Sequence, residues 1–248
     1  MFNSNEFISD MLLSVASQSH TDIEHIVIDG ASNDGTLDIL NRHRSNISVL
    51  ISEPDDGIYD ALNKGISCAS GEIIGFLHSD DFFASEDVLT NVISIFESDP
   101  SVSAVYGDLD YVLASMPDKV VRSWRSSHFS SRLLKQGWMP PHPTIYVRKE
   151  WYDRIGQFDK RYSISADYLS ILKLFSHPDF KAVYLREVMV KMRLGGISNR
   201  SFVTIFKKSV EDWNALRSCG FGILDAFYAL LLKNLRKVNQ FFIKFRSQ

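Results

Sequence analysis

Three short apolar runs in the first 81 residues are each followed by acidic side chains and then by a turn or a helical pattern. The runs with their acidic ends cover residues 26–29, 49–53 and 73–81. Strands that alternate with helices are typical of βαβ units, which build a mostly parallel sheet. Since the carboxyl ends of parallel strands lie along one sheet edge, where ligands bind, the acidic side chains are expected to converge there. The sequence therefore predicts an α/β fold with a polar site at one edge of the sheet.

The third run, Ile73–Leu77, continues through two polar residues into the adjacent carboxylates of Asp80 and Asp81. An apolar run of this length predicts a strand that is buried on both faces. Two acids at its end suit a hard cation such as Mg²⁺ or Mn²⁺, which completes its coordination with substrate phosphates. The alternative is that one of these acids caps a helix that begins near Ser85.

The composition is ordinary for a globular protein and argues against several classes of function. The 248 residues carry a formal net charge of −3, which gives no reason to expect nucleic acid as a partner. The two cysteines, Cys68 and Cys219, form no metal-binding or redox pattern. No secretory signal is recognised, and the apolar run over residues 226–232 is too short to span a bilayer. The sequence predicts a cytoplasmic protein with one large α/β domain or two small ones.

Six segments of the first 168 residues combine acidic turns, glycines and short apolar runs. They are Ile28–Thr36, Ser52–Ile66, Ala69–Asp81, His142–Lys149, Ile155–Asp159 and Ser165–Tyr168. In their order and spacing these segments resemble the family 2 glycosyltransferases of the GT-A fold. The resemblance implies a mostly parallel central sheet flanked by helices over residues 1–200, a nucleotide-sugar donor and a bound divalent metal. Residues 201–248 are expected to form a helical extension.

The family usually opens with a buried strand that ends in Tyr-Asn or Phe-Asn, and Phe2-Asn3 matches that pair. By this resemblance most of the first strand is missing, although the helical pattern from Phe7 to Val15 that follows it is intact. A neighbouring strand would then present an unpaired edge. We therefore expect lower stability or weaker nucleotide binding from the chain as written.

The metal ligand implied by the resemblance is Asp81, with Asp80 beside it contacting the ribose or a metal-bound water. A metal in this position would act as a Lewis acid on the departing diphosphate. Many relatives carry an acid at the position of His78, so the motif here is Ser-Asp-Asp. His78 is expected to be either a neutral neighbour of the metal ligands or a partly buried histidine with a backbone partner.

Residues that bind the donor are implied at the ends of the first two runs. Asp29 would accept a hydrogen bond from the imide N–H of a uracil-type base, or alternatively it forms an Asx turn before Gly30. Asp56 lies in the loop that approaches the base in relatives, whereas Asp55 is expected to be solvated. Lys64, one helix later, would either reach a phosphate or remain a surface lysine.

Asp167 is the predicted catalytic base. Inverting transfer is a direct displacement, so one carboxylate must take the proton of the acceptor hydroxyl. At the start of a helical pattern over residues 167–175, a carboxylate stays ionised because backbone N–H groups and the helix dipole face it. A plain N-cap has the same features and is the alternative. Many relatives have Glu-Asp here, but this chain has Ala166 before Asp167 and offers one acid.

Two further segments are predicted to face the substrates. In Gly137–Thr144, Trp138 and His142 would line the acceptor pocket, with a core position as the alternative for Trp138. Arg193 begins a segment with two glycines, residues 193–198, which is predicted to be a flexible lid over the donor.

The C-terminal segment has helical periodicity after residue 201, and its residues 226–248 contain five Lys or Arg and no Asp or Glu. Lys233, Lys237 and Lys244 are predicted to lie opposite the apolar face. A basic amphipathic helix of this kind binds the interface of an anionic membrane. The alternative is a helix that packs on its own domain or on a second subunit.

These observations together predict an inverting, metal-dependent glycosyltransferase of hexosyl or N-acetylhexosaminyl type. It would move a sugar from a nucleotide donor, UDP-linked, to a surface polysaccharide or lipid-linked glycan of the cell envelope. This would take place at the inner face of the plasma membrane. The alternatives are a sugar-phosphate nucleotidyltransferase, whose N-terminal glycine-rich stretch is not seen, and a catalytically impaired GT-A-like scaffold.

Overall fold

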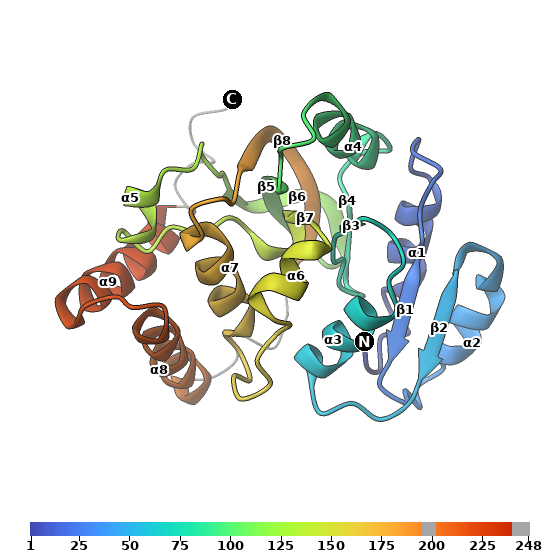
Figure 1. The fold of residues 1–248 in the computed structure, drawn as a ribbon. Helices are drawn as coiled ribbons and strands as arrows, with labels where there is room; N and C mark the ends of the chain where they lie inside the picture. Colours follow the sequence, from blue (N-terminus) through green and yellow to red (C-terminus); the bar gives the residue numbers. More distant parts are fainter. Residues whose placement is uncertain (195–201, 240–248) are drawn as a thin grey trace.

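The computed structural model describes residues 1–194 and 202–239, and helices flank its central strands (Figure 1). The strands are β1 Ile26–Asp29, β2 Val49–Ser52, β3 Ile73–Ile74, β4 Asp81–Phe83, β5 Ala104–Leu113, β6 Met116–Trp124, β7 Tyr146–Arg148 and β8 Ala182–Arg193. The α-helices are α1 Ile8–Ala16, α2 Thr36–Arg42, α3 Ile58–Cys68, α4 Val88–Ser98, α5 Ser131–Leu134, α6 Glu150–Ile155, α7 Ala166–Ser176, α8 Phe202–Ser218 and α9 Ile223–Asn239. Two short 3₁₀ helices cover Arg44–Asn46 and His142–Thr144. The predicted α/β fold class is confirmed.

The described strands form two sheets, and the larger one is mixed rather than mostly parallel. β1 and β2 pair in parallel as a two-stranded sheet. The larger sheet has the order β3-β7-β5-β8-β4, with β6 paired to β5. Within it β5 and β8 are parallel, and the other described pairs are antiparallel. β6 follows β5 after two residues, and so short a connection joins antiparallel strands only.

The first residues of the chain lie alongside the end of β1. The Met1 amino group donates to the Ile28 carbonyl at 2.7 Å, and the Gly30 N–H donates to the Met1 carbonyl at 2.7 Å. Bonds from one residue to two alternate residues of its neighbour are the pattern of a parallel strand pair. Phe2-Asn3 follows directly and occupies the place that the sequence assigns to the end of the first strand.

The predicted strand over Ile73–Leu77 is wrong in its extent. β3 covers only its first two residues, and Asp81 is the first residue of β4, which pairs with β8. Gly75 lies so close to Tyr146 that a Cβ there would be 2.3 Å from a ring carbon. The chain passes this ring and turns before it re-enters the sheet. The acidic pair therefore stands at a turn between two short strands, not at the end of a long one.

The C-terminal helices α8 and α9 pack against the rest of the described structure. α8 contacts α7, and α9 contacts α8. Figure 1 shows both helices on the opposite side of the molecule from β1 and β2. The domain boundary predicted at residues 200–201 lies outside the described residues. The helices share one buried core with α7, to which they contribute Ala215, Leu216, Ala226 and Ala229.

The predicted outward position of Lys233 is wrong. Its side chain is 6% exposed, and its amino group lies 2.8 Å from the Asp212 carboxylate and 3.1 Å from the centre of the Tyr168 ring. Burial lowers the pKa of Lys233 to about 8, although Asp212 opposes the shift. The side-chain positions of Lys237 and Lys244 lie outside the described part of the chain. Exposed apolar side chains of α9 include Leu224, Phe227, Tyr228, Leu231 and Leu235.

Gly137→Ala is expected to destabilise the protein by about 2–5 kcal/mol. Gly137 has a φ of +65°, and a Cβ there would lie 2.0 Å from the Ala229 carbonyl, so α9 would be displaced. Urea unfolding followed by circular dichroism measures the effect. Gly156→Ala is the matched control, because Gly156 has a φ of +82° but nothing within 4 Å of a new Cβ. The control should lose only the stability that a left-handed backbone conformation costs a residue with a Cβ, about 1–2 kcal/mol. Equal losses would contradict the packing of α9 against Gly137.

Candidate active site

The turn between β3 and β4 brings ionisable side chains from distant parts of the chain together. His78 lies in this turn, with its ring centre 6.4 Å from that of His142. Burial lowers the pKa of His78, although the charges of Asp80 and Asp167 oppose the shift. His142 stacks on Phe76 with ring centres 5.5 Å apart, and burial lowers its pKa to about 4. Both imidazoles are therefore neutral at pH 7.

The two adjacent carboxylates differ sharply in exposure. Asp80 is partly exposed, whereas Asp81 is 0% exposed and its carboxylate oxygens have no hydrogen-bond partner within the described residues. Burial raises the pKa of Asp81 well above its usual range, Asp80 adds to the shift, and Arg193 opposes it. Asp80 is the carboxylate of the pair that solvent reaches, and the two unpartnered oxygens of Asp81 lie buried beside it.

Arg193 supports this turn from the interior of the protein. Its guanidinium donates to the Asp80 carbonyl at 3.0 Å, and it forms an ion pair with Asp10. The side chain is 4% exposed and lies against two aromatic rings. Arg193 therefore holds the backbone of the turn. The other residues of the predicted lid, 195–198, lie outside the described residues.

Asp29 is fully buried at the end of β1. Its carboxylate accepts hydrogen bonds from the N–H and the hydroxyl of Ser32, and from the Ser52 hydroxyl at 2.7 Å. Asp29 therefore bonds the backbone N–H three residues on, one position beyond the bond of an Asx turn. A carboxylate has about four acceptor positions, so these three bonds leave one for a further donor.

The loop after β2 differs from the prediction at Asp55. Asp55, expected to be solvated, has a side chain only 9% exposed, and its carboxylate lies 2.6 Å from the Lys64 amino group. Asp56, expected to approach the base, is 87% exposed and lies 3.7 Å from the Lys160 amino group. Lys64 is also 2.9 Å from the Glu53 carboxylate. The positive charge of Lys64 is thus paired with the acidic side chains of this loop.

Asp167 is the second residue of α7 and is partly exposed. The Tyr59 hydroxyl shares its proton between the Ile164 carbonyl at 2.7 Å and the Asp167 carboxylate at 3.1 Å. Burial raises the pKa of Asp167, but nearby positive charges, including those of Lys208 and Lys233, outweigh it and leave the pKa below its ordinary value. The carboxylate is therefore ionised at neutral pH, as a general base must be.

The two aromatic side chains predicted to line the acceptor pocket have different surroundings. Trp138 is 7% exposed and packs against Tyr106, Phe129 and Phe175 with ring centres 5.5 to 5.7 Å apart. This is the core position that stood as its alternative. His142, in contrast, lies beside His78 at the acidic turn.

Two residues of this region were not predicted from the sequence. Tyr59 contacts the candidate base, and Asp55 lies under Gly30, where a Cβ would be 3.0 Å from the Asp55 carboxylate. Both stand in the segment Ser52–Ile66, which the sequence pattern had marked. The pattern does not indicate which side chains of that segment turn toward α7 or β1, because that depends on how the elements pack.

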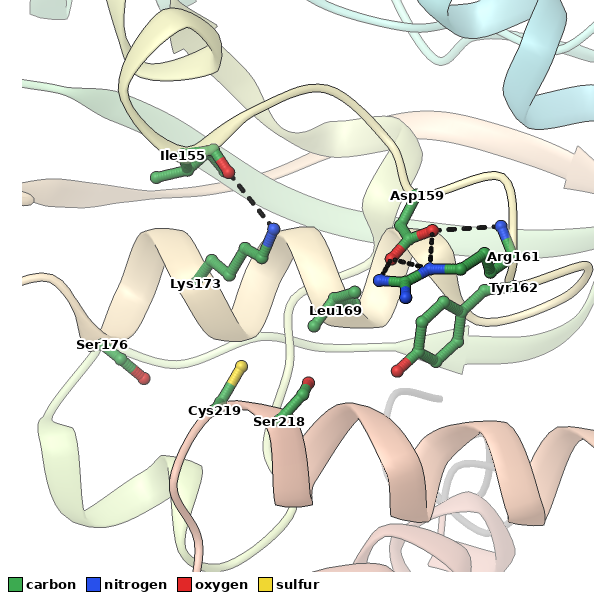
Figure 2. Close-up of a pocket in the computed structure, with 9 residues that line it drawn as sticks. All are labelled: Ile155, Asp159, Arg161, Tyr162, Leu169, Lys173, Ser176, Ser218 and Cys219. Carbon is green, nitrogen blue, oxygen red and sulfur yellow. Dashed lines mark hydrogen bonds and ion pairs between the residues drawn. The ribbon is translucent and has the colours of Figure 1, made fainter.

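A pocket of about 310 Å³ opens beside α7, away from these residues (Figure 2). In it Lys173 donates to the Ile155 carbonyl at 3.2 Å, and Arg161 pairs with Asp159 at 2.6 Å. Its described lining includes none of the predicted site residues. The pocket is therefore separate from the candidate active site.

The acidic turn fits a metal that is shared with a substrate. Among residues 1–194 and 202–239, no group of three or more His, Cys, Asp or Glu side chains is placed to hold a cation alone. Mg²⁺ is usually bound by one or two carboxylates together with substrate phosphates. Asp80, as a partly exposed carboxylate, can supply one such ligand.

A family model described as glycosyl transferase family 2 matches residues 1–155, more than half of the chain. This chain belongs to glycosyl transferase family 2. Over 195 residues the glycosyltransferase is 32% identical to a PGL/p-HBAD biosynthesis glycosyltransferase of Mycobacterium bovis (strain BCG / Pasteur 1173P2). That alignment covers 75% of this chain and 72% of the relative.

Solved structures of glycosyltransferases share the fold. S. aureus TarS in complex with UDP-GlcNAc matches 96% of the present glycosyltransferase and 71% of that chain, with a TM-score of 0.69 and 16% identity. The chain spans 43% of another, longer TarS structure. A mannosyltransferase from Pyrobaculum calidifontis in complex with GDP-Man and Mn²⁺ matches 94% of this glycosyltransferase and 66% of that chain, with a TM-score of 0.63 and 18% identity. At these identities the likeness shows the GT-A fold alone.

Proposed function

We propose that this family 2 glycosyltransferase transfers a hexosyl or N-acetylhexosaminyl group from a nucleotide donor to an acceptor hydroxyl with inversion. The observation that carries the proposal is Asp167, a partly exposed carboxylate in the first turn of α7 that accepts a hydrogen bond from the Tyr59 hydroxyl at 3.1 Å. In this step the acceptor oxygen attacks the anomeric carbon while its proton passes to Asp167. The nucleoside diphosphate leaves from the opposite face of the sugar, so the configuration inverts.

The donor base is proposed to lie against the loops that follow β1 and β2, with UDP as the nucleotide. Asp29 keeps one acceptor position for an imide N–H, and Asp56 is exposed at the neighbouring loop. TarS, which shares the fold, is known in complex with UDP and with UDP-GlcNAc. In this proposal Lys64 shapes the loop through its ion pairs with Glu53 and Asp55 and does not bind a phosphate.

Asp80 is proposed as the protein ligand of a Mn²⁺ or Mg²⁺ ion, with Asp81 behind it in the turn. The partial exposure of Asp80 supports this, as does the Mn²⁺ in the related mannosyltransferase structure. When bound, the metal would neutralise charge on the departing diphosphate. In this proposal Asp80 takes the place that the resemblance gave to Asp81.

The experiment that tests the donor class is calorimetric titration with UDP, GDP and dTDP, each with and without Mn²⁺. We expect UDP to bind in a metal-dependent manner and GDP and dTDP to bind more weakly. Transfer to a glycan acceptor, followed by NMR of the product anomer, then tests inversion. A folded sample that binds none of the three nucleotides would contradict the proposed function.

The acceptor is proposed to be a polysaccharide or lipid-linked glycan at the cytoplasmic face of an anionic membrane. No helix in the described part of the chain is long and apolar enough to cross a bilayer. Exposed apolar patches mark interaction surfaces. Segment 226–248 has no acidic residue and, besides the buried Lys233, four basic residues that complement anionic lipid. We call the exposed apolar side chains of α8 and α9 the outer face, which comprises Val203, Ile205, Phe206, Val210, Ile223, Leu224, Phe227, Tyr228, Leu231 and Leu235.

The double variant Phe227→Glu/Leu231→Glu is expected to bind vesicles of phosphatidylglycerol and phosphatidylcholine at least about 10-fold more weakly. Burial of each such apolar side chain contributes about 1.5–3 kcal/mol, and the new charges repel anionic lipid. Co-sedimentation measures the binding. Met116→Glu, at an exposed apolar position on β6, is the matched control. Unchanged vesicle binding in the double variant would reject the membrane proposal, and loss of a dimer instead would assign the outer face to a second subunit.

A further inference from the structure

The loop that leads into α7 is held by one side chain from α8. The Glu211 carboxylate accepts four hydrogen bonds of 2.8 to 3.1 Å from this loop. The donors are the N–H and hydroxyl of Ser163, the N–H of Ile164 and the N–H of Ser165. Glu211 is 9% exposed. A buried carboxylate that accepts several N–H bonds is ionised and rigidly placed.

The same loop is connected to the candidate base. The Ile164 N–H bonds Glu211, and the Ile164 carbonyl accepts from Tyr59, whose hydroxyl also contacts the Asp167 carboxylate. Ile164 is thus held on one side by α8 and on the other by the residue that touches Asp167. A shift of the loop would move Asp167 and Tyr59 together.

The neighbour of Glu211 in α8 fixes the other side of the base. Asp212 forms the buried ion pair with Lys233 of α9, at 2.8 Å. The Lys233 amino group lies over the ring of Tyr168, the residue after Asp167. Two consecutive residues of α8 therefore secure the chain just before and just after the base, and Glu211 makes the direct contacts.

We propose that Glu211 is a positioning residue for the transfer reaction. It fixes the loop over residues 163–165 and thereby the direction of the Asp167 carboxylate toward the acceptor hydroxyl. The inference rests on the proposed role of Asp167 as base. Because general-base catalysis depends on hydrogen-bond geometry, a displacement of about 1 Å costs on the order of 100-fold in rate. A residue that only stabilises the fold would not act on turnover in this way.

The test is Glu211→Gln in the full chain. Glutamine keeps the size of the side chain but places an NH₂ donor among N–H groups. We expect kcat to fall about 10-fold or more, with the affinity for UDP and Mn²⁺ unchanged. Amide hydrogen exchange at Ile164 and Ser165 should become faster, and this exchange rate can be measured without an activity assay. Glu150→Gln, at an exposed glutamate of α6, is the matched control and should change neither quantity.

A double variant separates positioning from general loss of structure. Adding Glu211→Gln to Asp167→Asn should cause no further fall in the residual transfer rate if Glu211 acts through Asp167, whereas independent effects would multiply. Ser163→Ala removes one of the four bonds and should give a smaller fall in kcat in the same direction. Ser163→Ala therefore still tests the inference if the Glu211→Gln variant does not fold.

Three outcomes would overturn the inference. The first is a Glu211→Gln variant with faster exchange at the loop but kcat within about twofold of the unmodified protein. The second is a loss of UDP affinity in proportion to the loss of kcat. The third is that the unmodified protein transfers sugar from none of the donors. In that case the proposed function itself has failed, and not the role of Glu211 alone.

Discussion

An Asp167→Asn variant is expected to bind the donor nucleotide normally and to lose about 10²- to 10⁴-fold in kcat. Asparagine has nearly the same shape and can still accept the hydrogen bond from Tyr59, so α7 and its loop should keep their positions. Its amide cannot take the proton of the acceptor hydroxyl. The loss should therefore appear in turnover and not in the binding of UDP, measured by calorimetry beside steady-state transfer kinetics.

The matched control for this variant is Asp179→Asn, which neutralises an exposed carboxylate shortly after the end of α7. It should retain normal kcat, since its contacts within residues 1–194 and 202–239 are with His177 and do not reach the acidic turn. Near-normal turnover in Asp167→Asn itself would place the base elsewhere in the molecule. A fall in UDP affinity equal to the fall in kcat would instead indicate that Asp167 shapes the donor site.

The fold class was predictable because it depends on local periodicity. β1, β2, α3 and α7 lie where apolar runs and helical spacing place them. The sheet order was not predictable in the same way, because β3 and β4 are two and three residues long. Their partners, Arg148 and Met192, are remote in sequence. Strands this short carry too little periodicity to indicate an antiparallel partner.

The error at Lys233 has a physical reason in the composition of α9. This helix presents apolar side chains to solvent and to the protein, and the inward ones include Ala226 and Ala229. Alanine is too small to dominate a helical pattern, so the larger leucines and phenylalanines defined the predicted apolar face and Lys233 was placed opposite it. Close approach of α9 to Gly137 requires small inward side chains, which is why the stronger pattern lies on the outer face.

The candidate site was predictable at the level of segments and not of single contacts. Asp167 and His142 stand in segments that the resemblance marked, and the structure brings both near His78. No sequence pattern indicated Glu211, because three of its four hydrogen-bond donors are backbone N–H groups, which every residue type except proline offers. The sequence pattern also could not indicate which of Asp80 and Asp81 is buried. Adjacent residues of an extended turn point to different sides, and only packing decides which side is buried.

Asp80→Asn is expected to remove most of the metal-dependent part of UDP binding, whereas Asp81→Asn should leave it nearly unchanged. Loss of an outer partner of a metal site already costs about 10- to 100-fold in metal affinity, and loss of a direct carboxylate ligand should cost at least as much. Titration of Mn²⁺ in the presence of UDP, followed by the electron paramagnetic resonance of free Mn²⁺, measures this affinity directly.

The two variants differ because the environments of the two carboxyl groups differ. Burial raises the pKa of Asp81 and favours its neutral form, which asparagine resembles closely, while Asp80 is the carboxylate of the pair that solvent reaches. Without metal, both variants should bind UDP as the unmodified protein does. The opposite result, in which Asp81→Asn loses Mn²⁺ and Asp80→Asn keeps it, would mean that the turn opens when metal binds. The unpartnered oxygens of Asp81 would then become the ligands, and Arg193, which holds the Asp80 carbonyl, would have to release the turn for this to happen.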